Sequence, residues 1–181
     1  MKEQHKEYVL GGGCFWCLEA IFQDLMGVLG VTSGYAGGVD PHPNYETIHD
    51  PASGHAEVVK VAFDAAIIPD ETLLDIFFVS HDPTTLNRQG NDVGPAYRSI
   101  MLFSDAEQER LFKAAKQRAE AVWDDPIVTE IVPLETFYEA EAEQQNFFRN
   151  HPEQAYCQVI IAPKLHKVRQ KYAKWFALNQ G

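Results

Sequence analysis

Two cysteines separated by two aromatic residues offer the clearest chemistry in this chain. Cys14 follows three glycines at positions 11–13, and Cys17 lies one helical turn further on. Residues 8–10 are apolar and predict a short buried strand, and apolar residues at helical spacing from Leu18 predict a helix. We therefore expect Cys14 at the N-terminus of that helix. Unpaired N–H groups and the helix dipole there favour a thiolate and lower the pKa of a thiol.

The cysteines also have alternative explanations. Free cysteine is among the residues most often buried, so Cys14 could be an ordinary core residue. The glycines favour a reactive sulfur, because they let backbone or ligand approach it closely. The Cys-x-x-Cys spacing is shared by redox dithiols and zinc sites. A zinc site needs two more ligands, and the nearest histidines, His42, His49 and His55, match no usual ligand spacing. We therefore expect no metal.

A glutamate on a predicted strand is the second candidate for chemistry. Alternation over residues 56–63 places Glu57 on the same face as Val59 and Val61, which is the apolar face expected to point inward. A buried carboxyl without a cation has a raised pKa and stays protonated near neutrality, so it can donate a proton. The pattern fits equally well a glutamate that reaches solvent at the end of its strand.

Five further residues gain interest from their surroundings. Tyr45 and Tyr97 lie in polar loops, where a phenol can offer its O–H, although packing is the commoner role of a tyrosine. Asp92 lies between two glycines, where it can form an Asx turn. Phe15 and Trp16 either wall an apolar pocket beside the sulfur or pack in the core.

The composition excludes several classes of protein. The 181 residues include 15 basic and 26 acidic side chains, giving a net charge of −11, so we expect neither nucleic acid nor an anionic membrane as partner. The longest apolar run, residues 76–79, is far too short to cross a bilayer, and the N-terminus lacks the apolar core of a signal peptide. Three cysteines are too few for a disulfide scaffold and fit a reducing compartment. We expect a cytoplasmic protein.

The rest of the chain predicts the elements that position these side chains. Predicted strands cover residues 8–10, 29–35, 56–63, 99–103 and 127–132. Predicted helices follow Cys14 and Pro69 and cover residues 104–122, 139–150 and 164–178, the first of these three opened by a capping box of Ser104 and Glu107. Residues 81–96 are polar and predict a long functional loop. We expect one α+β domain over residues 1–181, a two-layer sandwich of helices on a mixed sheet with a ferredoxin-like core and long loops.

Short motifs along the chain, taken together, resemble peptide methionine sulfoxide reductase of the A type. Six of them are Gly13-Cys14-Phe15-Trp16, Gly34-Tyr35-Ala36-Gly37-Gly38, Gly54-His55-Ala56-Glu57, His81-Asp82-Pro83-Thr84, Gln89-Gly90-Asn91-Asp92-Val93-Gly94 and Tyr97-Arg98-Ser99. Pro43-Asn44-Tyr45, Ala140-Glu141 and Tyr156-Cys157 extend the match, which covers roughly residues 8–172. The motifs stand in the family's order, which makes the resemblance specific.

The resemblance implies the reduction of methionine S-sulfoxide, free or in peptides and proteins, to methionine. Cys14 would attack the sulfoxide sulfur, and Glu57 would protonate its oxygen, helped by hydrogen bonds from two phenols. Tyr45 and Tyr97 would supply these two phenols. Phe15 and Trp16 would form an apolar seat for the substrate methyl group. Asp92 would shape the surroundings of the thiolate.

The resemblance also implies how the enzyme is recycled. Attack leaves Cys14 as a sulfenic acid, a second thiol converts it to a disulfide, and thioredoxin or a similar dithiol reduces that disulfide. Cys17 and Cys157 both stand at positions that resolve the sulfenic acid in members of the family. We expect Cys157 to act first, because Cys17 must turn its sulfur back along one helical turn. We expect a monomer without metal, flavin or nicotinamide, since the thiols carry the electrons.

Two segments depart from the family pattern. The family's Ala-Glu-x-x-His-Gln segment reads Ala-Glu-Ala-Glu-Gln-Gln at residues 140–145, and Asn-Pro-x-Tyr reads His-Pro-Asn-Tyr at residues 42–45.

Two rival functions remain. One rival is a general dithiol oxidoreductase that uses Cys14 and Cys17 on disulfides. The other is a non-catalytic module that binds oxidised methionine or a metal.

Overall fold

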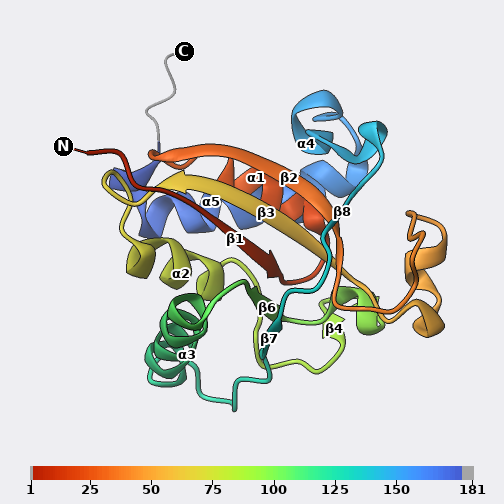
Figure 1. Cartoon of the computed structure of the whole chain (residues 1–181). Coiled ribbons are helices and arrows are strands. Elements are labelled where there is room, and N and C mark those ends of the chain that lie inside the picture. The colour runs from red at the N-terminus through yellow and green to blue at the C-terminus, as the bar shows by residue number, and fades with distance from the viewer. Residues whose placement is uncertain (1, 177–181) are drawn as a thin grey trace.

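A mixed sheet of six strands, in the order β7-β6-β1-β3-β2-β8, organises the fold (Figure 1). The structure is a computed structural model, and it describes residues 2–176. The strands are β1 (His5–Gly11), β2 (Val28–Ala36), β3 (Ala56–Asp64), β6 (Ile100–Phe103), β7 (Glu130–Pro133) and β8 (Tyr138–Glu139). β7 runs parallel to β6, and the other neighbours are antiparallel.

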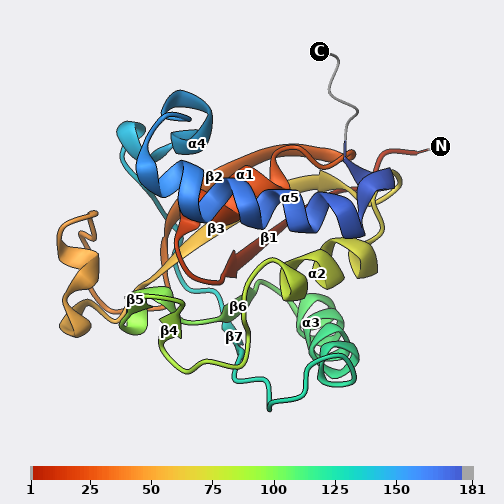
Figure 2. The same cartoon turned by 180° about the vertical axis from the view of Figure 1, so that it is seen from behind.

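Helices α1, α2 and α5 cover one face of this sheet (Figure 2). The helices are α1 (Phe15–Phe22), α2 (Asp70–Val79), α3 (Ala106–Glu120), α4 (Phe147–Asn150) and α5 (Ala162–Lys171). The chain order β1-α1-β2-β3-α2-β6 with neighbour order β6-β1-β3-β2 is the ferredoxin-like arrangement, as predicted. No helix within residues 2–176 has both the length and the apolar composition to cross a membrane.

Strand β3 has a core on each of its faces. Val59 and Val61 belong to the large core beneath the helices, whereas Ala56 and Val58 belong to a smaller core on the opposite face. The predicted alternation along this strand is therefore confirmed, and it places Glu57 on the helix side, where the side chain is buried.

The segment 139–150 does not form the predicted continuous helix. It contains the end of β8, a 3-10 turn at Ala142–Gln144 and the single turn of α4. The Gln145 side chain accepts a hydrogen bond from the N–H of Ser33 at 2.9 Å and donates one to its carbonyl at 2.9 Å. Asn146 then adopts a left-handed conformation with φ of 53°. These contacts with β2 outweigh the helical propensity of the segment.

Smaller differences concern element boundaries. The side chain that caps α3 is Asp105, which accepts from the N–H of Gln108 at 2.8 Å, rather than the predicted Ser104. A π-helical turn at Cys157–Ile161 precedes α5, which ends at Lys171, and position 178 lies outside the described residues. The predicted loop over residues 81–96 contains a small hairpin of β4 (Arg88–Gln89) and β5 (Asp92–Val93).

Candidate active site

A glycine turn between β1 and α1 holds Cys14 in place. A Cβ atom at Gly11 would lie 2.8 Å from a side-chain carbon of Ile100, and one at Gly12 would lie 2.7 Å from the ring of His81. Gly13 adopts a φ of 87°, which other residues rarely adopt. The turn therefore presses against its neighbours, and it leaves Cys14 as the N-cap residue of α1, as predicted.

All three cysteines are free thiols and belong to one small cluster. Cys14 is 8% exposed, and Cys17 and Cys157 are buried. They share the cluster with Phe147 and Ile161, so the start of the C-terminal helical segment lies against the start of α1. The fold therefore brings Cys157, which we expected to be the resolving thiol, into the same cluster as Cys14.

The charge of the Cys14–Cys17 pair differs from the prediction. Burial raises the pKa of the Cys14 thiol well above its ordinary value, and the contacts with Cys17 and Glu57 raise it further. The hydrogen bond with Cys14 lowers the pKa of Cys17, and the Lys164 ammonium lowers it as well, against the effect of burial. The N–H of Trp16 does lower the pKa of Cys14, but burial outweighs it. These directions oppose the thiolate predicted at Cys14 and make Cys17 the more acidic thiol of the pair.

Glu57 lies directly against the turn that carries the nucleophile. Its side chain is 1% exposed, and its Oε1 accepts a hydrogen bond of 3.2 Å from the N–H of Phe15. Burial raises the pKa of Glu57 to about 8, and the charges of Asp92 and Cys17 contribute to the rise. The carboxyl is therefore mostly protonated at neutral pH, as the strand pattern predicted.

His49, which the sequence suggested only as a possible zinc ligand, links Glu57 to a tyrosine. Nε2 of His49 lies 2.9 Å from the Tyr97 hydroxyl and 3.7 Å from Oε2 of Glu57. Tyr45 stacks edge-on against the His49 ring, and burial with the Glu57 charge raises the pKa of Tyr45 to about 12. His49 ends a short 3-10 turn (Thr47–His49) in the connection between β2 and β3, where no periodicity orients the side chains, so no sequence signal pointed to this role.

The aromatic residues after Cys14 are held in a stack. The Trp16 indole lies parallel to the Phe147 ring, with centroids 3.6 Å apart. It also stacks against Tyr45 and meets the Tyr156 ring edge-on. The indole N–H donates a hydrogen bond of 3.0 Å to Oε1 of Gln144, the residue that replaces the family's histidine in the 140–145 segment. Phe15 is fully buried in the main core. Both Phe15 and Trp16 therefore pack against the Tyr45 ring, on the side of the site that faces the core.

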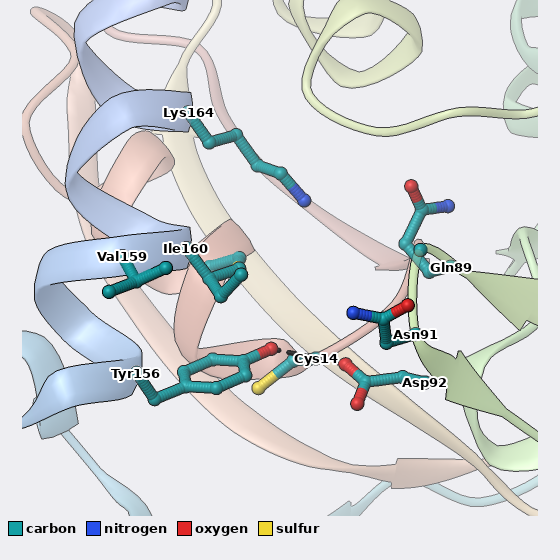
Figure 3. A pocket seen from close by; sticks show the side chains of 10 residues that line it. Cys14, Gln89, Asn91, Asp92, Tyr156, Val159, Ile160 and Lys164 are labelled. Atoms are coloured by element: carbon teal, nitrogen blue, oxygen red, sulfur yellow. Dashed lines mark hydrogen bonds between the residues drawn. The ribbon is translucent and has the colours of Figure 1, made fainter.

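A cavity of about 550 Å³ opens beside Cys14, between the C-terminal helical segment and the β4–β5 hairpin (Figure 3). Its lining residues are Cys14, Cys17, Gln89, Gly90, Asn91, Asp92, Tyr156, Val159, Ile160 and Lys164. The Tyr156 hydroxyl donates a hydrogen bond of 3.1 Å to Oδ2 of Asp92, which joins the two walls next to the sulfur. Tyr156 was noted only as part of a motif, and Lys164 had no sequence signal, because its place depends on how α5 packs.

Cys14 and the other predicted residues gather at this end of the sheet. Asp92 lines the cavity, Glu57 lies behind Cys14, and Tyr45 and Tyr97 flank His49. A buried pair of thiols at a helix N-terminus beside a protonated carboxyl can donate both electrons and a proton. The fold and this site define a thiol-dependent oxidoreductase.

The family model for peptide methionine sulfoxide reductase matches residues 6–176, and the chain belongs to this family. Peptide methionine sulfoxide reductase MsrA of Pseudarthrobacter chlorophenolicus is 55% identical over 170 residues, which cover 94% of this chain and 98% of the relative. The reduced form of Mxr1 from Saccharomyces cerevisiae has a similar structure, with a TM-score of 0.80 and 30% identity over 85% of this chain and 90% of that one. Mxr1 in complex with Trx2 also matches, with a TM-score of 0.57 and 25% identity over 81% of this chain and 89% of that one.

Proposed function

We propose that this enzyme reduces methionine S-sulfoxide, free or in peptides and proteins, with Cys14 as nucleophile and Glu57 as proton donor. One observation carries the proposal: a buried carboxyl with a pKa of about 8 lies against the turn that holds a buried thiol pair. A sulfoxide oxygen leaves only when it is protonated, so a neutral acid must stand beside the nucleophile. Glu57 meets this requirement at neutral pH.

In the first step the Cys14 sulfur bonds to the sulfoxide sulfur while its proton passes to the sulfur of Cys17. The hydrogen bond between these two sulfurs and the lowered pKa of Cys17 support that transfer. Glu57 gives its proton to the oxygen, and the hydroxyl group so formed passes from the substrate sulfur to the Cys14 sulfur. The bond between the two sulfurs breaks, which leaves Cys14 as a sulfenic acid. The substrate gains two electrons and leaves as methionine, and Cys14 is oxidised by two electrons.

The surrounding residues orient the sulfoxide. The phenols of Tyr45 and Tyr97 stay protonated, because burial and the Glu57 charge raise their pKa values, and they donate hydrogen bonds to the oxygen. Trp16, which is only partly buried, provides the apolar contact for the substrate methyl group, and Phe15 supports it from the core by packing against Tyr45. Asp92 accepts from Tyr156 beside the sulfur and shapes the surroundings of the thiol pair.

The second step forms a disulfide. The Cys17 thiol attacks the sulfenic sulfur of Cys14, the bond between that sulfur and its hydroxyl group breaks, and the hydroxyl group leaves as water with the proton of Cys17. The existing contact between the two sulfurs favours Cys17 as the first resolving thiol, ahead of the Cys157 that we expected from the sequence. Cys157 lies in the same cluster and can exchange with that disulfide.

Thioredoxin is the proposed reductant of the final disulfide. The structural likeness to Mxr1 in complex with Trx2 supports this partner. We further propose that the protein acts as a monomer in the cytoplasm, a reducing compartment that would keep the free thiols of the cycle available.

Single-turnover experiments with excess methionine S-sulfoxide and no reductant test the proposal. The wild type should release one methionine per enzyme and form a Cys14–Cys17 disulfide, and Cys14→Ser should release none. Cys17→Ser should accumulate a sulfenic acid that a trapping reagent captures, whereas Cys157→Ser should not. Turnover by Cys14→Ser, or reduction of insulin disulfides without consumption of sulfoxide, would overturn the proposed reaction. A first disulfide between Cys14 and Cys157 would overturn only the resolving order.

A further inference from the structure

The cavity beside Cys14 carries the Lys164 ammonium, which forms no ion pair with a carboxylate within residues 2–176. The lysines and arginines that form ion pairs within residues 2–176 are Lys6, Arg98, Arg110, Lys113, Arg118, Arg149 and Arg169. Lys164 is not among them, although it is only partly exposed. Figure 3 shows its side chain extending from α5 toward the space between that helix and the hairpin. An unpaired ammonium in a cavity is a binding site for an anion.

The opposite wall of the cavity carries the opposite charge. Asp92 extends from β5 toward Tyr156, and Cys14 lies between the two walls (Figure 3). A cavity of about 550 Å³ has the size of a site for a small molecule. An α-amino acid carries an ammonium and a carboxylate on one carbon, and so complements a site with one anion and one cation. A residue inside a polypeptide carries neither charge.

We propose that Lys164 binds the α-carboxylate of free methionine sulfoxide and of substrates with methionine sulfoxide at the C-terminus. This inference rests on the proposed function, because the substrate sulfur must sit against Cys14 while its carboxylate reaches Lys164. The Lys164 ammonium then raises the affinity for carboxylate-bearing substrates over internal residues of a peptide. Its action on the charge of Cys17 is a separate effect, which influences every substrate equally.

Four small substrates separate these effects. Methionine S-sulfoxide and its N-acetyl derivative keep the carboxylate, whereas methionine S-sulfoxide amide and N-acetyl-methionine S-sulfoxide amide lack it. Loss of one charge-assisted contact in Lys164→Met should raise KM roughly tenfold or more for the two carboxylates. For the two amides, KM should stay within about twofold. Lys164→Arg should retain the preference of the wild type.

Lys167→Met is the matched control, because Lys167 lies on the same helix and does not line this cavity. It should leave KM unchanged for all four substrates. Binding to Cys14→Ser, which cannot turn over, should show the same preference for N-acetyl-methionine S-sulfoxide over its amide, and Lys164→Met in that background should abolish it. An equal change of KM for all four substrates in Lys164→Met, or no change for any, would overturn the inference. Absence of turnover by the wild type on every substrate would instead refute the proposed function.

Discussion

Glu19 in α1 and Glu57 beside it are both buried glutamates, and their surroundings differ in hydrogen-bond donors and in charge. Glu19 accepts hydrogen bonds from the Ser33 hydroxyl at 3.2 Å and from the N–H of Phe147 at 3.3 Å, and Arg149 is a favourable charge nearby. Glu57 accepts from one backbone N–H, and its charged neighbours are negative. Burial raises the pKa of both carboxyls, but donors oppose the rise mainly at Glu19. A shortage of donors, more than burial itself, distinguishes the proton donor from the structural residue.

The largest effect that this comparison predicts is on catalysis. Glu57→Gln removes the proton donor and keeps the shape, so kcat should fall about 10²–10⁴-fold while the sulfoxide still binds. Glu19→Gln leaves the reacting groups in place, and its kcat should stay within several-fold of the wild type. Steady-state kinetics with thioredoxin in excess measures both variants. Equal losses in the two variants would remove the distinction between the glutamates.

The same pair predicts opposite effects on stability. The pKa of Glu57 is about 8 in the folded protein and roughly 4.3 when unfolded, so between these values the unfolded chain binds fewer protons and stability falls as pH rises. A glutamine does not titrate, so Glu57→Gln removes this decrease of stability with rising pH. Relative to the wild type, its free energy of unfolding should therefore increase by about 3 kcal/mol between pH 5 and pH 7.5. A difference that does not depend on pH would contradict the raised pKa.

Glu19→Gln should instead lose stability. The NH2 group of the glutamine has to face the Ser33 hydroxyl or the N–H of Phe147, both of which donate to the carboxylate in the wild type. The lost hydrogen bond costs about 1–3 kcal/mol. Urea unfolding of both variants at the two pH values measures these effects. A Glu19→Gln protein as stable as the wild type would show that the donors around Glu19 do not hold it as described.

The two glutamates also show how far a sequence can define such a site. The alternation along β3 places Glu57 on the buried face, because a strand has a fixed period and both of its faces are covered. Its donor count depends on the turn before α1, which belongs to another part of the chain. His49, Gln144 and Lys164 escaped prediction for the same reason, since each acts through a contact more than forty residues away along the chain. The raised pKa of Cys14 escaped as well, because the sequence offered both a helix N-terminus and burial at this position and could not decide which effect is larger.

The most direct test is an infrared titration of the Glu57 carboxyl in the folded enzyme. The difference spectrum between wild type and Glu57→Gln isolates the C=O stretch of this one protonated group, and Glu19→Gln serves as the control that must leave it unchanged. The account predicts that the band is present at pH 6.5 and disappears with a midpoint near pH 8. A midpoint near 4.5, or no such band at neutral pH, would contradict a neutral acid beside Cys14.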